Sequence, residues 1–176
     1  WIRCLAAAPD GGILVAATAQ LGVCRPGPDG ATHFESWLPR LPARLQPPGP
    51  VWSVVWHNDA AWFAGSTFVA RFRGNDVQVW DFPVPTRATL ASVDGRLLLR
   101  RNGDALYHWD GRGFARLSTE ADLVAPTFAA FAGGDAGGIL ALTERGHGFR
   151  LQGNRLERWQ PPVAAEVAQR GLRAML

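Results

Sequence analysis

A pattern of strands and turns that recurs four times in tandem constrains the fold of this chain more than any single motif. Each copy has an apolar segment, a turn rich in Asp, Asn or Gly, a second apolar segment, a short third segment and a closing one. The turn residues Asp10, Asn58, Asp94 and Asp135 are equivalent and recur about every forty residues, which is the length of a propeller blade. The repeat therefore predicts a series of propeller blades.

Each copy predicts four strands. They are residues 2–7, 13–18, 21–25 and 32–37 in the first copy, 51–56, 61–65, 68–73 and 77–80 in the second, 89–93, 96–100, 105–109 and 114–117 in the third, and 127–132, 139–143, 148–151 and 156–159 in the fourth. We expect an all-β fold, a β-propeller fragment of four four-stranded antiparallel blades at about 1–40, 51–82, 87–118 and 126–160. Residues 161–176 are then a short connection and the start of a further blade strand.

Composition agrees with short strands joined by tight turns. Apolar residues make up 47% of the chain and charged residues 19%, whereas Gly and Pro occupy 20 and 13 positions, a balance that favours strands and turns over long helices. The basic residues are scattered arginines and the net charge is only +3, so we expect no nucleic-acid partner. No apolar run approaches the roughly twenty residues that cross a bilayer, so any membrane contact would come from parts of a larger protein.

Blades at the ends of an open array leave apolar sheet faces uncovered, and such faces favour association. We therefore expect an open partial propeller that forms a homodimer through exposed blades. The alternative is closure of the four blades into a ring.

Large and sulfur-containing side chains have structural interpretations. We expect Trp62, Trp80, Trp109 and Trp159 to fill the space between blades. Nearly continuous apolar runs at 13–15 and 97–99 predict strands that are covered on both faces. The two cysteines, Cys4 and Cys24, belong to the first and third strands of one sheet, and strands are about 4.8 Å apart, so they are too distant for a disulfide. Two buried free thiols are the prediction.

The details of the repeat resemble a known family. An Asp-Gly turn, a strand such as residues 62–66 (WFAGS) or 15–18 (VAAT), and then residues 21–25 (LGVCR) resemble the two-component regulator propeller repeat. This resemblance implies a non-catalytic, ligand-binding sensor region of a bacterial membrane receptor, periplasmic or extracellular, whose output domain is a histidine kinase or a GGDEF diguanylate cyclase. Two alternatives stay open: a protein-interaction scaffold, and a fragment of a propeller-fold enzyme.

Motifs for catalysis or metal binding do not stand out in the sequence. No Gly-x-Ser-x-Gly elbow occurs, and no serine has a motif context that links it to a histidine and an aspartate. The four histidines belong to different copies of the repeat, which does not match the spacing of metal ligands. We therefore expect no catalytic residues, no metal and no cofactor.

Ligand binding is expected where the loops between second and third strands meet the connections between blades. The residues of this chain in those loops are Gln20, Arg101, Asn102, Asp104, Glu144, Arg145 and His147. Arg101, Arg145 and His147 could receive an anionic or carbohydrate-like small molecule through charge-assisted hydrogen bonds. The alternative interpretation is that all seven are ordinary solvated loop residues.

Overall fold

The computed structural model describes residues 1–117, 128–133, 138–143 and 147–159. The chain folds as two compact units, residues 1–92 and residues 93–176. No helix among the described residues is long and apolar enough to span a membrane. The predicted strand start within 161–176 lies outside the described residues.

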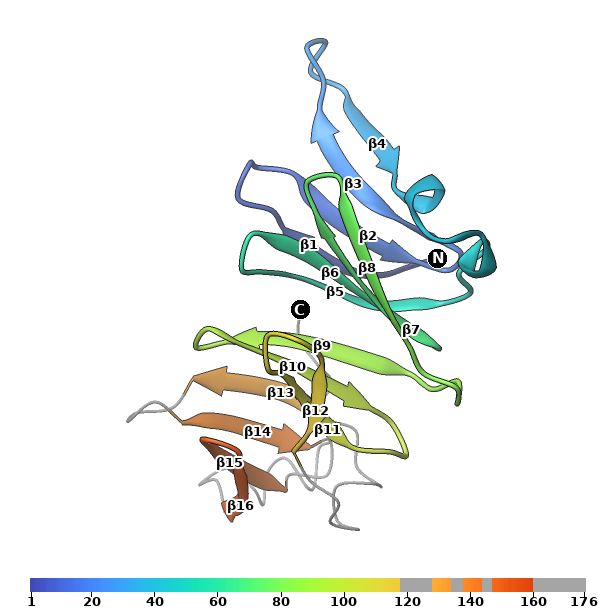
Figure 1. Cartoon of the computed structure of the whole chain (residues 1–176). Helices are drawn as coiled ribbons and strands as arrows, with labels where there is room; N and C mark the ends of the chain where they lie inside the picture. Colours follow the sequence, from blue (N-terminus) through green and yellow to red (C-terminus); the bar gives the residue numbers. More distant parts are fainter. Residues whose placement is uncertain (118–127, 134–137, 144–146, 160–176) are drawn as a thin grey trace. The chain divides into compact units, whose positions relative to one another are not determined.

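Each repeat forms one antiparallel sheet in which strands that follow one another in sequence are neighbours (Figure 1). The first sheet has β1 (Ile2–Ala7), β2 (Ile13–Ala17), β3 (Gln20–Pro26) and β4 (Thr32–Ser36), and the second has β5 (Val51–His57), β6 (Ala60–Gly65), β7 (Phe68–Arg73) and β8 (Asp76–Asp81). The third has β9 (Ala88–Val93), β10 (Arg96–Arg101), β11 (Leu106–Trp109) and β12 (Phe114–Arg116), and the fourth has β13 (Phe128–Gly133), β14 (Ile139–Thr143), β15 (Gly148–Gln152) and β16 (Arg155–Trp159). The predicted fold class, four four-stranded antiparallel sheets, is confirmed.

Tight turns between first and second strands explain why the hairpins form where the repeat predicts them. Asn58 and Asp59 have φ angles of 47° and 57°, and Asp94 and Gly95 have φ angles of 48° and 70°. Positive φ at both central residues is the geometry of the two-residue hairpin turn that matches strand twist, and Asn, Asp and Gly adopt it most readily.

The core of the first unit lies between the first and second sheets. Leu14 and Leu21 on one sheet and Phe63 and Phe68 on the other have no exposed surface and belong to the same apolar cluster. Trp37 follows β4 and packs edge-on against Phe63, with ring centroids 5.9 Å apart. Each sheet thus covers the apolar face of the other, as expected for neighbouring propeller blades.

The insertion after the first sheet closes one side of this core. It carries two short 3₁₀ helices, η1 (Leu38–Arg40) and η2 (Ala43–Leu45). Leu41, between them, is 3% exposed and joins the cluster, while the Arg40 guanidinium lies over the Trp37 ring. Arg44 Nη2 bonds Asp81 Oδ2 at 2.5 Å. These contacts tie the insertion to both sheets.

Burial of the tryptophans differs from the prediction. Trp62 is 1% exposed and stacks on Trp80, with centroids 5.5 Å apart, so its core role is confirmed. Trp80, Trp109 and Trp159 are only half-buried. Trp109 instead packs edge-on against Phe114 of the adjacent strand β12.

Both cysteines are free thiols, as predicted, but neither is fully buried. Cys4 lies 3.7 Å from the Val54 carbonyl oxygen and packs against the core of the first unit. Cys24 pairs with Ile13 and Phe34 on the face of the sheet that points away from this core. The prediction of full burial is therefore wrong for both.

That outer face of the first sheet is apolar and exposed. Leu5, Ile13 and Phe34 are 49%, 47% and 45% exposed, and cross-strand pairing puts them on one face. The prediction that residues 13–15 are covered on both faces is thus wrong at Ile13. Residues 97–99, by contrast, are at most 1% exposed, as predicted.

Candidate functional site

The β10–β11 loop of the second unit brings together three of the predicted ligand residues, Arg101, Asn102 and Asp104. Asp104 Oδ2 accepts a hydrogen bond from the Tyr107 hydroxyl at 2.8 Å and lies 3.8 Å from Arg101 Nη1. Its other oxygen lies 3.7 Å from Arg116 Nη2. Arg101 itself is only 4% exposed. The carboxylate therefore compensates the charges around it, and Arg101 serves an internal ion pair.

Burial also governs the ionisation of this loop cluster, which we define as Arg101, Asp104, Tyr107 and Arg116. Burial and the hydrogen bond with Asp104 raise the pKa of the Tyr107 hydroxyl above its ordinary value. Burial lowers the pKa of Arg101, and the negative charge of Asp104 opposes that shift. The loop cluster is thus a polar network in which Asp104 pairs with both arginines and with the Tyr107 hydroxyl.

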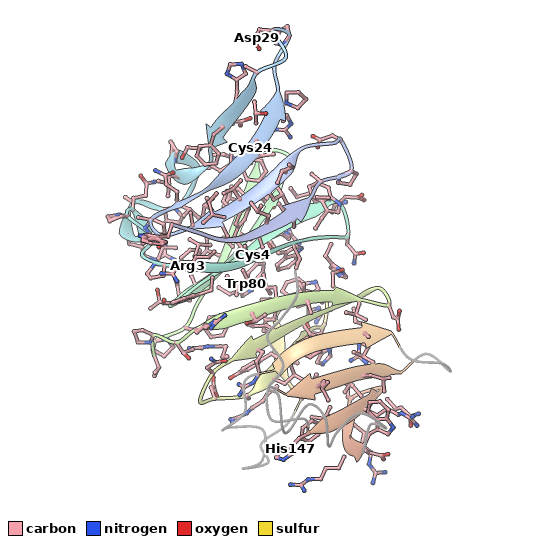
Figure 2. All side chains as sticks on the ribbon, turned by 180° about the vertical axis from the view of Figure 1, so that it is seen from behind. Arg3, Cys4, Cys24, Asp29, Trp80 and His147 are labelled. Carbon is pink, nitrogen blue, oxygen red and sulfur yellow. The ribbon has the colours of Figure 1, made fainter. Side chains whose placement is uncertain are left out.

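The remaining predicted residues lie elsewhere. Gln20 begins β3 in the first unit, where its Oε1 accepts a hydrogen bond from Ser36 Oγ at 3.1 Å. His147 is exposed and directly precedes β15 in the second unit (Figure 2). Glu144 and Arg145 lie outside the described residues. The predicted set of seven is thus distributed over both units.

In the first unit, backbone hydrogen bonds join the loops between second and third strands to the segments that connect one sheet to the next. Ala19, after β2, donates to the Gly49 carbonyl at 2.8 Å, and Thr86, after β8, donates to the Ser66 carbonyl at 2.9 Å. Ala19 has a φ of 61°, an uncommon value for a residue other than glycine. We call this surface the loop face of the first unit.

An aromatic ring with two arginines lies at the loop face. Arg3 Cζ is 4.7 Å and Arg87 Cζ is 5.6 Å from the centroid of the Trp52 ring. Arg3 is on β1, Trp52 is on β5, and Arg87 directly precedes β9. Both arginines are exposed and the tryptophan is half-buried. We name these three residues the Arg–Trp–Arg cluster, and Figure 2 labels Arg3 near the start of β1.

Two β-bulges orient this cluster. On β1, Ile2 pairs with Ala17 and Cys4 with Ala16, which leaves Arg3 as the extra residue. On β5, Val51 pairs with Gly65 and Ser53 with Ala64, which leaves Trp52 as the extra residue. A bulge redirects a side chain out of the regular alternation, and bulges are common next to binding sites. Equivalent strands in two repeats therefore aim Arg3 and Trp52 by the same device.

Hydroxyl groups hold the cluster in place. Trp52 Nε1 donates to Ser66 Oγ at 2.9 Å, and Arg3 Nε makes a long contact of 3.4 Å with Thr18 Oγ1. Both hydroxyls belong to loops between second and third strands. In these contacts the hydroxyl oxygens accept, so each O–H can still donate to a further group.

Among the described residues, nothing compensates the charge of the Arg–Trp–Arg cluster. Within the part of the chain that the structure describes, no carboxylate forms an ion pair with Arg3 or Arg87. The indole face offsets part of the repulsion between the guanidinium groups through cation–π attraction. An anion placed between the two arginines would accept charge-assisted hydrogen bonds from both.

Sequence reasoning missed this cluster because its members are far apart in sequence and belong to strands or to a connection. The available signal was positional: Arg3 and Trp52 occupy the second position of the first strand in their repeats. A metal site has no comparable support, since no group of three or more His, Cys, Asp or Glu gathers among the described residues.

No protein-family model matches the chain, and no curated protein matches it. Solved structures do. Virginiamycin B lyase from Staphylococcus aureus is 12% identical with a TM-score of 0.67 over 92% of this chain and 56% of the other. The WD40 β-propeller domain of Doa1 is 11% identical with a TM-score of 0.66 over 92% and 54%. YCF48 bound to D1 peptide is 14% identical with a TM-score of 0.58 over 89% and 53%.

The chain thus spans about half the length of these solved structures. At such low identity the likeness concerns the fold, and the proteins themselves differ in function. The comparisons and the four sheets agree that the chain has the β-propeller fold.

Proposed function

We propose that this chain is a non-catalytic, ligand-binding portion of a β-propeller, and that it serves the sensory part of a bacterial signal-transduction receptor. The observation that carries the binding role is the Arg–Trp–Arg cluster at the loop face of the first unit, whose two arginines pair with no described carboxylate. Propellers present loops from several blades on one face, and binding residues are frequently on loops held by a rigid scaffold.

The chemistry of the cluster supports binding over catalysis. Arginine stays protonated in proteins, and the indole N–H of Trp52 is a donor only. Such groups can hold an anion but cannot act as a general base. Among the described residues, the hydroxyls of Thr18 and Ser66 contact Arg3 and Trp52 and no histidine or carboxylate, which fits a binding role as well.

The sensory role rests on the resemblance of the repeats to the two-component regulator propeller. The same resemblance implies a periplasmic or extracellular location, and it implies a kinase or diguanylate cyclase output domain in the parent protein. In this proposal, ligand binding changes the packing of blades and so biases a distant output. A homodimer through the apolar outer face of the first sheet is part of the same proposal, and sedimentation velocity tests it.

A peptide-binding scaffold is the second candidate. It is favoured by the solved structure of YCF48 bound to D1 peptide, whose fold is similar to that of this chain. An acidic peptide would satisfy the same arginines. A fragment of a propeller-fold enzyme is the third possibility, and it has no supporting group in the cluster.

A thermal-shift screen tests the proposed function. Acidic and neutral sugars, small organic acids and acidic peptides are added to the chain one at a time. A specific ligand raises the melting temperature, because a free ligand concentration of 100 times Kd stabilises the folded chain by about 2.7 kcal/mol. We expect at least one small molecule to do so. A shift with peptides alone would support the scaffold, and no shift with any class would count against a binding module.

A further inference from the structure

The chemistry of the Arg–Trp–Arg cluster indicates which class of ligand it binds. This inference rests on the proposed binding function. We propose that the cluster binds the carboxylate of a small acidic ligand between Arg3 and Arg87, and that this bound group fastens β1, β5 and the connection to β9 to one another.

The polarity of the site favours an acidic ligand. Its side chains offer two guanidinium groups and the remaining hydrogens of the Thr18 and Ser66 hydroxyls, all of which are donors. A neutral sugar hydroxyl both donates and accepts, and among these side chains only the remaining lone pairs of the Thr18 and Ser66 oxygens could accept its hydrogen, while the guanidinium groups would meet no charge. A carboxylate only accepts, and its two oxygens offer about four acceptor positions. The side chains of the cluster therefore complement an oxyanion.

Electrostatics points the same way. The guanidinium carbons of Arg3 and Arg87 lie 4.7 Å and 5.6 Å from the centroid of one ring, so their separation is at most the sum of these two distances, a span that one small ligand can bridge. Like charges at this separation repel, and the loop face contributes no described carboxylate that pairs with them. A ligand carboxylate would remove this repulsion in addition to forming its own hydrogen bonds.

The fastening follows from where the three residues originate. Arg3 belongs to the first sheet and Trp52 to the second, while Arg87 lies on the segment that leads from the second sheet into β9. In the ligand-free chain these elements are joined near the cluster by backbone bonds such as Ala19 to Gly49 and Thr86 to Ser66. A ligand that accepts hydrogen bonds from both arginines adds a bridge between β1 and the connection to β9. Binding should therefore slow the local opening of these elements.

The experiment uses the whole chain and four probes: glucuronate, glucose, inorganic phosphate and inorganic sulfate. Affinities come from isothermal titration at low and at moderate salt. We expect glucuronate to bind and glucose not to bind, and we expect the affinity for glucuronate to fall as salt rises. Arg3→Gln and Arg87→Gln should each weaken binding about 10- to 100-fold, because each removes a hydrogen bond to a charged group.

Matched variants separate the proposal from a general charge effect. Arg73→Gln removes an exposed arginine of the same unit outside the cluster and should leave affinity unchanged. Arg87→Lys keeps the charge but loses the planar fork, so it should recover only part of the affinity. None of these changes should lower the melting temperature of the ligand-free chain by more than about 2 °C, because all three arginines are exposed.

Hydrogen exchange of amides in β1 and β5 tests the fastening, and we expect glucuronate to slow it in the parent chain but not in Arg3→Gln. Equal binding of glucose and glucuronate, or unchanged affinity in both glutamine variants, would overturn the inference while leaving a ligand-binding module in place. Binding of phosphate and sulfate without glucuronate would replace the carboxylate by a tetrahedral anion and so overturn the assigned class. If none of the four probes binds, the inference fails, and the wider thermal-shift screen decides the proposed function separately.

Discussion

The Arg–Trp–Arg cluster of the first unit and the loop cluster of the second unit contain similar parts, namely two arginines and an aromatic side chain. They differ in one group. Asp104 lies 3.8 Å from Arg101 and 3.7 Å from Arg116 and accepts from Tyr107, whereas no described acid pairs with Arg3 or Arg87. One carboxylate thus separates an internal network from a site that can accept an external anion. Loop position alone does not distinguish the two.

The largest expected effect comes from removing that carboxylate. Asp104→Ala should lower the free energy of unfolding by about 2 to 3 kcal/mol, since it removes the carboxylate that faces the buried Arg101; the value is moderate for such a change because Asp104 is partly exposed. Urea unfolding measures the change. As a control, Asp76→Ala breaks a more exposed ion pair with Arg71 and should cost less than about 1 kcal/mol. Equal costs for the two variants would show that the loop cluster is not an internal network.

The hydroxyl of Tyr107 provides the next test. Tyr107→Phe should cost about 1 kcal/mol, because Asp104 loses a partly buried hydrogen bond. In the folded chain, burial and Asp104 raise the pKa of Tyr107, so the neutral phenol is favoured by folding. The stability that this provides is complete below the ordinary tyrosine pKa of about 10 and is lost as pH rises through the higher pKa of the folded chain.

Tyr107 is the single tyrosine of the chain, so tyrosinate absorbance reports its ionisation directly. The midpoint should lie above that of the unfolded chain, and Asp104→Ala should move it only part of the way back, because burial is the larger cause. A folded midpoint at or below the unfolded value would contradict the described environment of the loop cluster.

The smallest expected effect comes from adding a carboxylate to the first unit. Ser66→Asp introduces an acid beside Trp52 Nε1 and should raise the free energy of unfolding by up to about 1 kcal/mol, the range of exposed ion pairs. Ser66→Asp should also abolish glucuronate binding, because the new carboxylate competes with the ligand for ion pairs with Arg3 and Arg87. Ser66→Asn, which has a size similar to that of Ser66→Asp and no charge, is the control; it removes the same hydroxyl and should bind glucuronate more tightly than Ser66→Asp. Retained binding in Ser66→Asp would show that the ligand does not use these arginines.

Local chemistry explains why most of the fold could be predicted from sequence. The strands Phe68–Arg73 and Ile139–Thr143 have the predicted bounds, because apolar residues and turn residues delimit them directly. Turns at Asn58 and Asp94 follow from residues that adopt positive φ readily. Burial was harder to predict, since whether Ile13 or Trp109 is covered depends on the neighbouring sheet and not on its own strand.

For the candidate site, the sequence indicated a type of surface and a type of residue, but not the residues of the Arg–Trp–Arg cluster. The sequence indicated loops between second and third strands as the binding surface, and arginine as the ligand-binding residue. It did not indicate that Arg101 meets Asp104 within its own loop, nor that Arg3 and Trp52 are bulged residues. A bulge is a property of strand register, so it depends on pairing between two strands and leaves little trace in the composition of either.

The bulge recurs in the fourth sheet as well, where Phe128 pairs with Thr143 and Ala130 with Leu142, leaving Ala129 as the extra residue. An extra residue contributes nothing to the ladder of hydrogen bonds, so the sheet tolerates side chains of very different character there: arginine, tryptophan and alanine occupy the three positions. Specificity in such a protein can therefore change by single substitutions at one place in each of these three repeats, without redesign of the scaffold. For protein engineering, the second residue of β1, β5 or β13 is the natural place to graft a new recognition group.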